Sequence, residues 1–416
     1  MFLIISPYQN SRLAYVAILI SKFLNCEVKI QKHLPSNQVP FLCYADTNYC
    51  NAKIFIASNG LLLEKHIRPI EMLWDTDLQC LLAFKNKSTF GFDVFSAMFF
   101  HVTRYEEYLI QARDDLGRFK VLNAVLFKNN LVKTPLVDLH LLMLQEAIFQ
   151  CFPQFSTGVK QYQYLPSMDI DIAFDYLGRD LKRNIGAALN DIYKLKLANL
   201  WKRILVNFGL AKDPAFIFNK VLSTPILYFI HTGKYGAFDK SCGFNHPEYL
   251  NFIKNIPRNS IAIHPSFQSY LAISIIKSEI EKLEKLSGKQ ITKSRQHFIK
   301  LILPESYQML IQLGITDDYS MGWPNMSGYR AGTAMSYPFF DLTTNELTNL
   351  TIHPFMWMDT HYIFNNDLTL EDGLREFEEF KQHCKRIGVP FIPIFHNNHF
   401  KIARYTVFLD LLNSTL

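Results

Sequence analysis

The stretch Tyr164-Leu-Pro-Ser-Met-Asp169-Ile-Asp171-Ile-Ala-Phe174 decides how the rest of the chain is interpreted. Strand-forming residues lead here into two carboxylates, and because side chains alternate along a strand, Asp169 and Asp171 point to the same side. Two acids at the end of a buried strand are costly unless a metal, an arginine or a substrate proton interacts with them. The alternative is that the pair only caps a strand and opens a turn. The order of the polar residues that follow favours the first interpretation.

The second half of the chain predicts a parallel sheet around this stretch. Seven β-like runs recur at separations that leave room for helices, at 162–168, 226–230, 260–263, 291–297, 315–318, 350–352 and 391–395. Helical periodicity is clearest at 270–286, 304–313 and 370–387. Strands that alternate with helices predict a β/α architecture, either an incomplete barrel or an open doubly wound sheet. In both, chemistry gathers at the carboxyl ends of strands.

Residues 1–160 predict a smaller α/β domain ahead of that sheet. Apolar runs at 2–5 and 53–57 indicate strands, and 13–24 and 137–150 indicate helices. The segment 151–160 contains Pro, Ser, Thr and Gly and marks the expected boundary, so the main domain is expected at 161–416. Ion pairs at a helix surface or domain contact explain Arg104, Glu106 and Glu107 better than a role in function.

Residues 177–221 predict a helical insertion rich in Lys and Arg. Its apolar residues, among them Ile185, Leu189 and Trp201, recur at helical spacing and form stripes. We expect a helix pair that packs these stripes on the main domain and leaves a solvated basic face. The alternative is a platform for peripheral contact with a membrane surface or a lipid-linked substrate.

The composition describes a globular protein without strong constraints on its partners. The chain has 416 residues, which predicts two or three domains, and 49% of them are hydrophobic and 19% charged. A net charge of +6 permits an acidic partner without requiring one, and no basic stripe with interleaved aromatics indicates nucleic acid. The seven cysteines are scattered and form no Cys-x-x-Cys pair, which indicates reduced thiols and argues against a cysteine-built zinc site. The start lacks a basic n-region and no apolar run is long enough to span a membrane, so we expect a cytoplasmic protein without a transmembrane segment.

The order of the motifs resembles the NodB-homology polysaccharide deacetylases. More narrowly, the chain is similar to a bacterial branch with an uncharacterised N-terminal α/β domain, which Phe92-Asp-Val-Phe and Thr103-Arg-Tyr-Glu-Glu-Tyr108 resemble. The resemblance implies a distorted (β/α)7 barrel and a metal-dependent hydrolase that removes N- or O-acetyl groups from sugars. It further implies a role in surface polysaccharide or envelope biosynthesis. The substrate would be an acetylated amino sugar. Because the sequence has no export signal, we expect an intracellular intermediate, for which a nucleotide or a lipid linkage is one possibility.

The resemblance also implies roles for individual residues. Asp169 stands at the position of the general base, Arg295 at that of the arginine that braces the base, and His396 at that of the general acid. Asp171 and His264 stand at metal-ligand positions.

The sequence departs from the family pattern at one metal ligand. Gln268 stands where the second histidine of a His-x-x-x-His motif is expected, and an amide is a much weaker ligand than an imidazole. His297, on the same strand face as Arg295, is the candidate replacement. Zn²⁺ suits an imidazole-containing site, although the altered ligand set leaves the metal open.

Elementary chemistry agrees with these roles. A divalent ion held by Asp171 and His264 would acidify a water and polarise an acyl carbonyl. Asp169, kept ionised by Arg295, would accept the water's proton, and His396 would protonate the departing amine.

Four further residues near strand ends are candidate substrate contacts, each with a structural alternative: Asp318, Trp323, Arg330 and Asp359.

Two other classes of function remain open at this stage. A catalytically inactive glycan-binding homologue of the same fold would explain Gln268, because two protein ligands hold zinc weakly. A glycosyltransferase would use an Asp-x-Asp, either the central pair or Asp75-Thr-Asp77. The ordered Arg295 and His396 motifs favour the deacetylase over the transferase.

Overall fold

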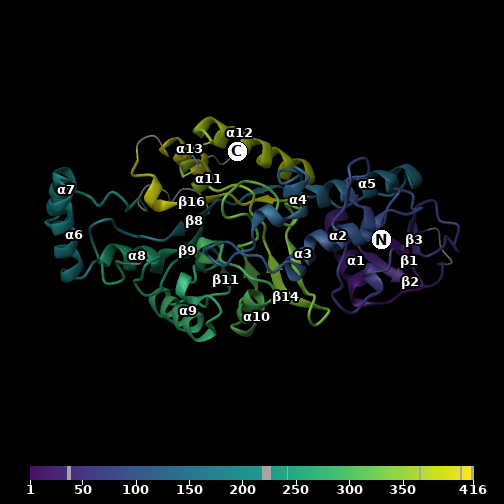
Figure 1. Cartoon of the computed structure of the whole chain (residues 1–416), viewed down its shortest axis with the longest axis horizontal. Coiled ribbons are helices and arrows are strands. Elements are labelled where there is room, and N and C mark those ends of the chain that lie inside the picture. Colours follow the sequence, from purple (N-terminus) through teal and green to yellow (C-terminus); the bar gives the residue numbers. More distant parts are fainter. Residues whose placement is uncertain (35–38, 218–225, 241, 365–366, 403–404, 414–416) are drawn as a thin grey trace.

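The computed structural model describes residues 1–34, 39–217, 226–240, 242–364, 367–402 and 405–413. A smaller sheet lies at one end of the molecule and a larger sheet lies in its middle (Figure 1). The smaller sheet has the order β2-β1-β3-β4 and is parallel throughout. Its strands are β1 (Phe2–Ile5), β2 (Val28–Gln31), β3 (Phe41–Ala45) and β4 (Phe55–Ala57). A short antiparallel pair, β5 (Trp74–Asp75) and β6 (Cys80–Leu81), follows.

The helices of the N-terminal region are α1 (Ser11–Leu24), α2 (Val94–Val102), α3 (Tyr105–Leu109), α4 (Val125–Lys128) and α5 (Leu136–Cys151). The helices α1, α2 and α5 lie beside the smaller sheet, whereas α3 and α4 lie between the two sheets (Figure 1). The helix α1 begins where the Asn10 side chain accepts the Leu13 N–H and ends at Asn25, which adopts the left-handed conformation that closes helices. Its buried face packs on the sheet, as the apolar spacing of residues 13–24 predicts.

The larger sheet carries the order β13-β14-β12-β11-β10-β9-β8-β16 among the described residues. The strands are β8 (Ser167–Ile170), β9 (Leu227–Ile230), β10 (Ile261–Ile263), β11 (Lys293–Ser294), β12 (Asp317–Asp318), β13 (Tyr337–Asp341), β14 (Glu346–Ile352) and β16 (Ile394–His396). Every neighbouring pair is parallel except β13 and β14. A separate parallel pair joins β7 (Gln163–Tyr164) to β15 (Pro390–Phe391). The predicted mixed α/β class with a parallel-rich sheet is confirmed.

The helices associated with the larger sheet follow the predicted alternation. They are α8 (Pro247–Asn255), α9 (Ile273–Ser287), α10 (Glu305–Gln312), α11 (Thr360–Ile363), α12 (Leu370–Ile387) and α13 (Val407–Asn413). Short 3-10 turns join several of these elements. Among the described helices, none is long and apolar enough to cross a membrane.

The sequence predicts a seven-stranded barrel, and one short contact joins the two sides of the larger sheet as such a barrel would require. The chain leaving β14 pairs with the far edge strand through a parallel bridge between Met358 and Ile394. The Asp359 N–H donates to the Ile394 carbonyl at 3.1 Å, and the Ile394 N–H donates to the Trp357 carbonyl at 3.1 Å. These contacts bring the two sides of the sheet together around the strand ends, but the strands described here do not show a closed barrel.

The predicted insertion forms a helical hairpin that projects from the end of the molecule opposite the small sheet (Figure 1). It consists of α6 (Leu181–Tyr193) and α7 (Leu197–Asn207), and residues 218–221 of the prediction lie outside the described residues. The expectation that its apolar stripes pack on the main domain is wrong, since Leu189 is 60% and Trp201 63% exposed. The two helices instead hold each other through the buried Asp191–Arg203 ion pair at 2.9 Å.

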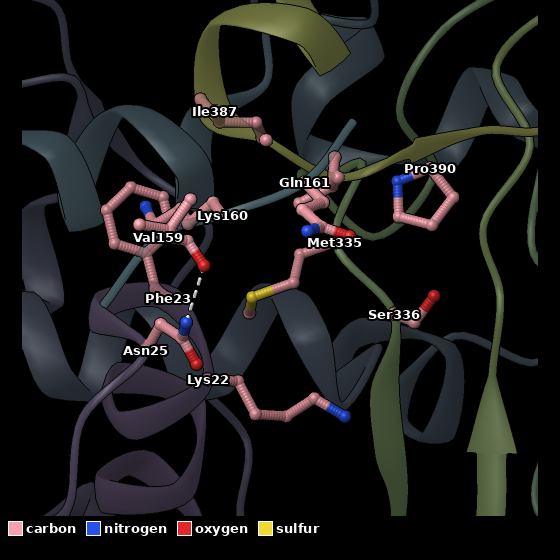
Figure 2. Close-up of a pocket in the computed structure, with 12 residues that line it drawn as sticks. Lys22, Phe23, Asn25, Val159, Lys160, Gln161, Met335, Ser336, Ile387 and Pro390 are labelled. Carbon is pink, nitrogen blue, oxygen red and sulfur yellow. Dashed lines mark hydrogen bonds between the residues drawn. The ribbon is translucent and has the colours of Figure 1, made fainter. Parts of the chain in front are cut away.

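The two sheet regions meet along the segment that connects them. Figure 2 shows the Asn25 side chain donating to the Val159 carbonyl, a hydrogen bond of 2.7 Å, at a cavity of about 420 Å³. The Lys160 ammonium lies 3.6 Å from the centre of the Phe23 ring. Near the start of α1, the Tyr15 hydroxyl donates to the Pro338 carbonyl of β13 at 2.9 Å. The N-terminal helices therefore pack directly on the β13–β14 hairpin, and one apolar core runs through both regions.

Candidate active site

The tips of parallel strands bring the candidate catalytic residues together. Asp169 lies at the end of β8 and is the register partner of His396 on β16. His264 directly follows β10 and Arg295 directly follows β11. Because these strands are parallel, their carboxyl ends share one edge of the sheet, where a cavity of about 440 Å³ opens.

Three side chains could hold a metal ion at the bottom of this cavity. The Asp171 Oδ1 atom lies 3.2 Å from His264 Nε2 and 3.6 Å from His297 Nε2. This oxygen is buried and has no hydrogen-bond partner among the described residues. A buried, unpaired carboxylate oxygen that faces two imidazole nitrogens is a donor set that fits a divalent cation, zinc in particular.

The other nitrogen of each imidazole is already occupied. His264 Nδ1 lies 2.6 Å from the Arg295 carbonyl oxygen, and His297 Nδ1 lies 2.9 Å from Asp239 Oδ1. Both partners are acceptors, so Nδ1 carries the hydrogen in each ring. When the rings are neutral, Nε2 therefore carries the lone pair and faces Asp171, which is the tautomer that metal binding requires.

The electrostatics of this group favour a positive charge between the side chains. Burial raises the pKa of Asp171, but the His297 and His264 imidazoles outweigh burial and hold that pKa well below its usual range. Burial lowers the pKa of His297, but Asp171 and Asp239 outweigh it and raise the value to about 9. The two carboxylates thus favour protonation of the His297 imidazole. A cation held by Asp171, His264 and His297 would supply the positive charge instead, and His297 would lose its Nε2 proton on binding it.

Arg295 fixes the carboxylate of Asp169. Its guanidinium is fully buried and donates to Asp169 Oδ1 at 2.7 Å, to the Ser167 hydroxyl at 2.9 Å and to the Tyr319 carbonyl at 3.0 Å. The Asp169 Oδ2 atom, which Arg295 does not hold, lies 3.7 Å from His264 Nε2 and 3.9 Å from His396 Nε2. One oxygen of Asp169 is therefore anchored and the other faces the cavity.

His396 stands across the cavity with a buried carboxylate behind it. His396 Nδ1 lies 2.7 Å from Asp359 Oδ1, and the His396 backbone N–H donates to Asp359 Oδ2 at 2.8 Å. Burial lowers the pKa of His396, but the Asp359 carboxylate outweighs burial and raises it to about 9. The imidazole is thus a protonated donor whose Nε2 faces Asp169.

Asp359 does not contact the cavity, in contrast to its prediction as a substrate contact. Its side chain is fully buried, and both oxygens are taken by His396 and by His399 Nδ1 at 3.0 Å. These two imidazoles outweigh the effect of burial and hold the pKa of Asp359 far below its usual range. Asp359 is placed to orient histidines rather than to bind a sugar.

The other predicted substrate contacts lie outside the residues that line the cavity. Asp318 is buried and accepts hydrogen bonds from the Ser294 hydroxyl at 2.7 Å and the Ser320 N–H at 2.8 Å. The guanidiniums of Arg104 and Arg330 lie over the Trp323 ring, 5.3 and 5.4 Å from its centre. Arg330 in turn donates to both oxygens of Glu107, at 2.9 and 2.7 Å. Trp323 and Arg330 thus stabilise the contact between the two regions, as expected for Glu107, whereas Asp318 bonds within the second region.

Three site residues were not predicted from the sequence. Asp239 lies in the segment after β9 and is fully buried against His297. His231 directly follows β9 and lies 3.5 Å from Asp239, so its position at a strand end was a usable signal. His399 follows His396 by one 3-10 turn, which places both rings beside Asp359. Gln268, by contrast, is exposed and does not line the cavity.

The N-terminal region supplies part of the cavity rim through Leu116 and Arg118. The Arg118 guanidinium pairs with Asp114 at 2.8 Å and donates to the Phe298 carbonyl at 2.9 Å and to Asn325 Oδ1 at 3.3 Å. Phe298 and Asn325 are themselves lining residues. Arg118 therefore ties the rim contributed by the first region to the rim contributed by the second.

Comparisons with known proteins find a family model that matches only the N-terminal part of the chain. Residues 2–153 match the model of a family of unknown function (DUF7033). A search of curated proteins finds no match. A solved structure described as "putative polysaccharide deacetylase from Mycobacterium smegmatis" has 14% sequence identity and a TM-score of 0.38, and the similarity covers 62% of this chain and 84% of that one.

Proposed function

We propose that the chain is a metal-dependent hydrolase that removes an acetyl or similar acyl group from the nitrogen of an amino sugar. The observation that carries the proposal is the unpaired Asp171 oxygen facing two Nε2 atoms. Beside it stands a carboxylate braced by arginine, and across from it a histidine braced by aspartate. The sugar as substrate class, and a glycan intermediate of envelope or surface polysaccharide assembly, come from the sequence resemblance.

Asp171, His264 and His297 would hold the cation, and zinc suits this carboxylate and imidazole set. Such a cation supplies Lewis acidity, which lowers the pKa of water and offsets negative charge on an acyl oxygen. His297 supports the proposal further, because it offers an imidazole where Gln268 offers none. The strongest argument for an inactive sugar-binding homologue is thereby weakened.

The residues of the chain account for the proton transfers. Asp169, anchored through one oxygen, accepts a proton from the attacking water through the other. His396 gives its Nε2 proton to the amide nitrogen as the carbon–nitrogen bond breaks, because an unprotonated amine anion is a poor leaving group. Water is consumed, and a carboxylate and an amine are released. Asp359 keeps the His396 ring oriented with Nε2 towards the cavity.

Acetate release from a panel of N-acetylated amino sugars, with and without exhaustive chelation, tests the proposal. We expect activity to disappear on chelation and to return with Zn²⁺. Removing either proton-transfer group, by Asp169→Asn or His396→Ala, should lower kcat by about 100- to 10,000-fold. Near-stoichiometric metal in the purified protein should accompany activity.

Two outcomes would replace the proposal. Tight sugar binding by a metal-free protein without acetate release would identify a glycan-binding module. Sugar transfer from a nucleotide donor, abolished by Asp171→Ala and never accompanied by acetate, would identify a transferase. The second Asp-x-Asp does not support a transferase, since Asp75 accepts the Asp77 and Leu78 N–H groups within a tight turn.

A further inference from the structure

The α6–α7 hairpin exposes an apolar surface that no other described part of the chain covers. Four large apolar side chains on α6 recur at a spacing of one helical turn, as do four on and just after α7. They are Leu181, Ile185, Leu189 and Ile192 in the first helix, and Leu197, Trp201, Ile204 and Phe208 in the second. All eight are exposed. An apolar stripe of this length on a protruding element indicates a binding surface.

Helix geometry places both stripes on one side of the hairpin. The helices face each other at Asp191 and Arg203, which pair between them. Ile192 and Ile204 each follow one of these contact positions by one residue, which is a rotation of about 100° about the helix axis. Since the chain reverses at 194–196, the two helices run in opposite directions and equal rotations bring both stripes to the same side.

The hairpin also carries nearly all of the net charge of the chain. Residues 177–213 contain eight basic and three acidic residues, a net charge of +5, against +6 for the 416 residues together. Lys182 and Lys202 each follow an apolar stripe position by one residue, so they flank the apolar face on its outer edges. Lysines in this place can extend towards anions while their stems remain on the apolar surface.

A basic cavity opens at the base of the hairpin. It has a volume of about 410 Å³, and its lining includes Arg179, Lys202, Arg203 and Lys401 together with Asp175. Asp175 is paired with Lys401 at 2.7 Å, and Arg203 with Asp191. Arg179 and Lys202 add further positive charge to the same cavity, which is the chemistry that recognises a phosphate.

We propose that the α6–α7 hairpin docks on an anionic membrane surface. Its apolar face lies at the boundary of headgroups and acyl chains, its lysines contact lipid phosphates, and Trp201 and Tyr193 lie at the headgroup level. Charge argues against a second copy of the chain as the occupant, because two segments of net charge +5 would be brought together. The proposal is independent of the proposed hydrolase.

Co-sedimentation of the whole chain with vesicles tests the proposal. We expect partitioning onto phosphatidylcholine vesicles that contain phosphatidylglycerol, weak partitioning onto phosphatidylcholine alone, and loss of binding at high salt. Replacing both Lys182 and Lys202 with Gln should weaken binding roughly 30-fold, because each lysine near an anionic surface adds a similar contribution to the attraction. The double variant Ile185→Ser with Leu189→Ser should also abolish partitioning, whereas Leu122→Ser, an exposed apolar site in the N-terminal region, should not.

Trp201 gives a second measurement. Of the other three tryptophans, Trp323 and Trp357 are buried and Trp74 is partly buried in the N-terminal region, so insertion of Trp201 should account for a shift of the tryptophan emission to shorter wavelength on anionic vesicles. Trp201→Phe should keep binding and lose that shift. Equal binding to neutral and anionic vesicles would overturn the proposal, as would the absence of vesicle binding. A dimer that Leu189→Ser dissociates, in protein that binds no vesicles, would assign the face to a second copy instead. Circular dichroism of each variant verifies folding.

Discussion

At the level of single residues, each imidazole facing the cavity is oriented by an acceptor on its Nδ1 atom. The acceptor is the Arg295 carbonyl for His264, Asp239 for His297 and Asp359 for His396. The Nε2 atoms therefore already face the cavity when no ligand is bound. This preorganisation is a property of residues behind the imidazoles, and it can be measured separately from catalysis.

Replacing Asp239 with Asn should weaken metal binding about 10- to 100-fold, the usual effect of losing the carboxylate behind a metal-binding histidine. The Asn side chain can no longer hold the His297 ring through a charged acceptor, so the ring is less well oriented. Competition with a chromophoric chelator measures the affinity directly, without recourse to activity.

A matched control exists elsewhere in the chain. Asp317 contacts His353 Nε2 at 2.8 Å in the same kind of carboxylate–imidazole pair, away from the cavity. Asp317→Asn should leave metal affinity unchanged. If both variants lost metal equally, the effect would reflect general destabilisation, and a specific role for Asp239 would be excluded.

The pair of His396 and Asp359 predicts the pH dependence of the proposed reaction. A general acid must be protonated, so kcat/KM should fall as the pH rises through the pKa of His396, which Asp359 raises. In Asp359→Asn that raising interaction is lost, the pKa of His396 falls, and the alkaline limb of the profile should move to lower pH. His399→Gln keeps the contact between Asp359 and His396, so the alkaline limb of this variant's profile should not move to lower pH. If the alkaline limb of the profile were unchanged in Asp359→Asn, His396 would be excluded as the general acid.

At the level of elements, the sequence predicts the strands well because a parallel sheet requires apolar runs separated by helices. The prediction at 226–230 corresponds to β9 and that at 370–387 to α12. Strand ends then locate Asp169, His264 and His396 at one edge, since parallel strands align their carboxyl ends.

What the sequence does not predict depends on packing between distant segments. Trp323 follows a strand end, as a pocket residue would, but it packs against the guanidiniums of Arg104 and Arg330 and does not line the cavity. Asp239 lies in a loop without a motif, and only the fold brings it to His297. The amphipathic pattern of α6 and α7 predicts helices, but the pattern does not state what covers their apolar face.

The loop that carries Arg118 gives a prediction at this level. Arg118→Ala removes the hydrogen bonds that hold Phe298 and Asn325 at the cavity rim. We expect KM to rise about tenfold with kcat nearly unchanged, because the loop shapes the substrate site without taking part in the proton transfers. Arg113→Ala is the control, since Arg113 donates to the backbone carbonyls of Ile110 and Ala112 and does not line the cavity. A selective loss of kcat in Arg118→Ala would contradict this role.

At the level of the whole molecule, buried ion pairs connect the N-terminal region to the loop between β12 and β13. Glu107 accepts from Arg104 at 2.8 Å and from Arg330 at 2.7 Å, and all three side chains are almost completely buried. Burial raises the pKa of Glu107, but the two guanidiniums outweigh it and lower the value to about 2. The carboxylate is thus charged in the folded protein, and its loss would take the acidic partner from the buried Arg330, whereas Arg104 would keep Glu106 at 2.8 Å.

Glu107→Gln should therefore destabilise the protein by about 3–5 kcal/mol, the usual cost of breaking a buried ion pair. The folded-state pKa lies below the ordinary value of 4.5, so the stabilisation is fully present above pH 4.5 and is lost as the pH falls towards about 2. The difference in free energy of unfolding between wild type and variant should thus be constant near neutral pH and shrink in acid. Urea denaturation across this range measures it, with the exposed Glu346→Gln as the control that should change little. A difference that stayed constant down to the lowest pH would mean that the charge of Glu107 does not hold the two regions together, and that the apolar core shared between them does so alone.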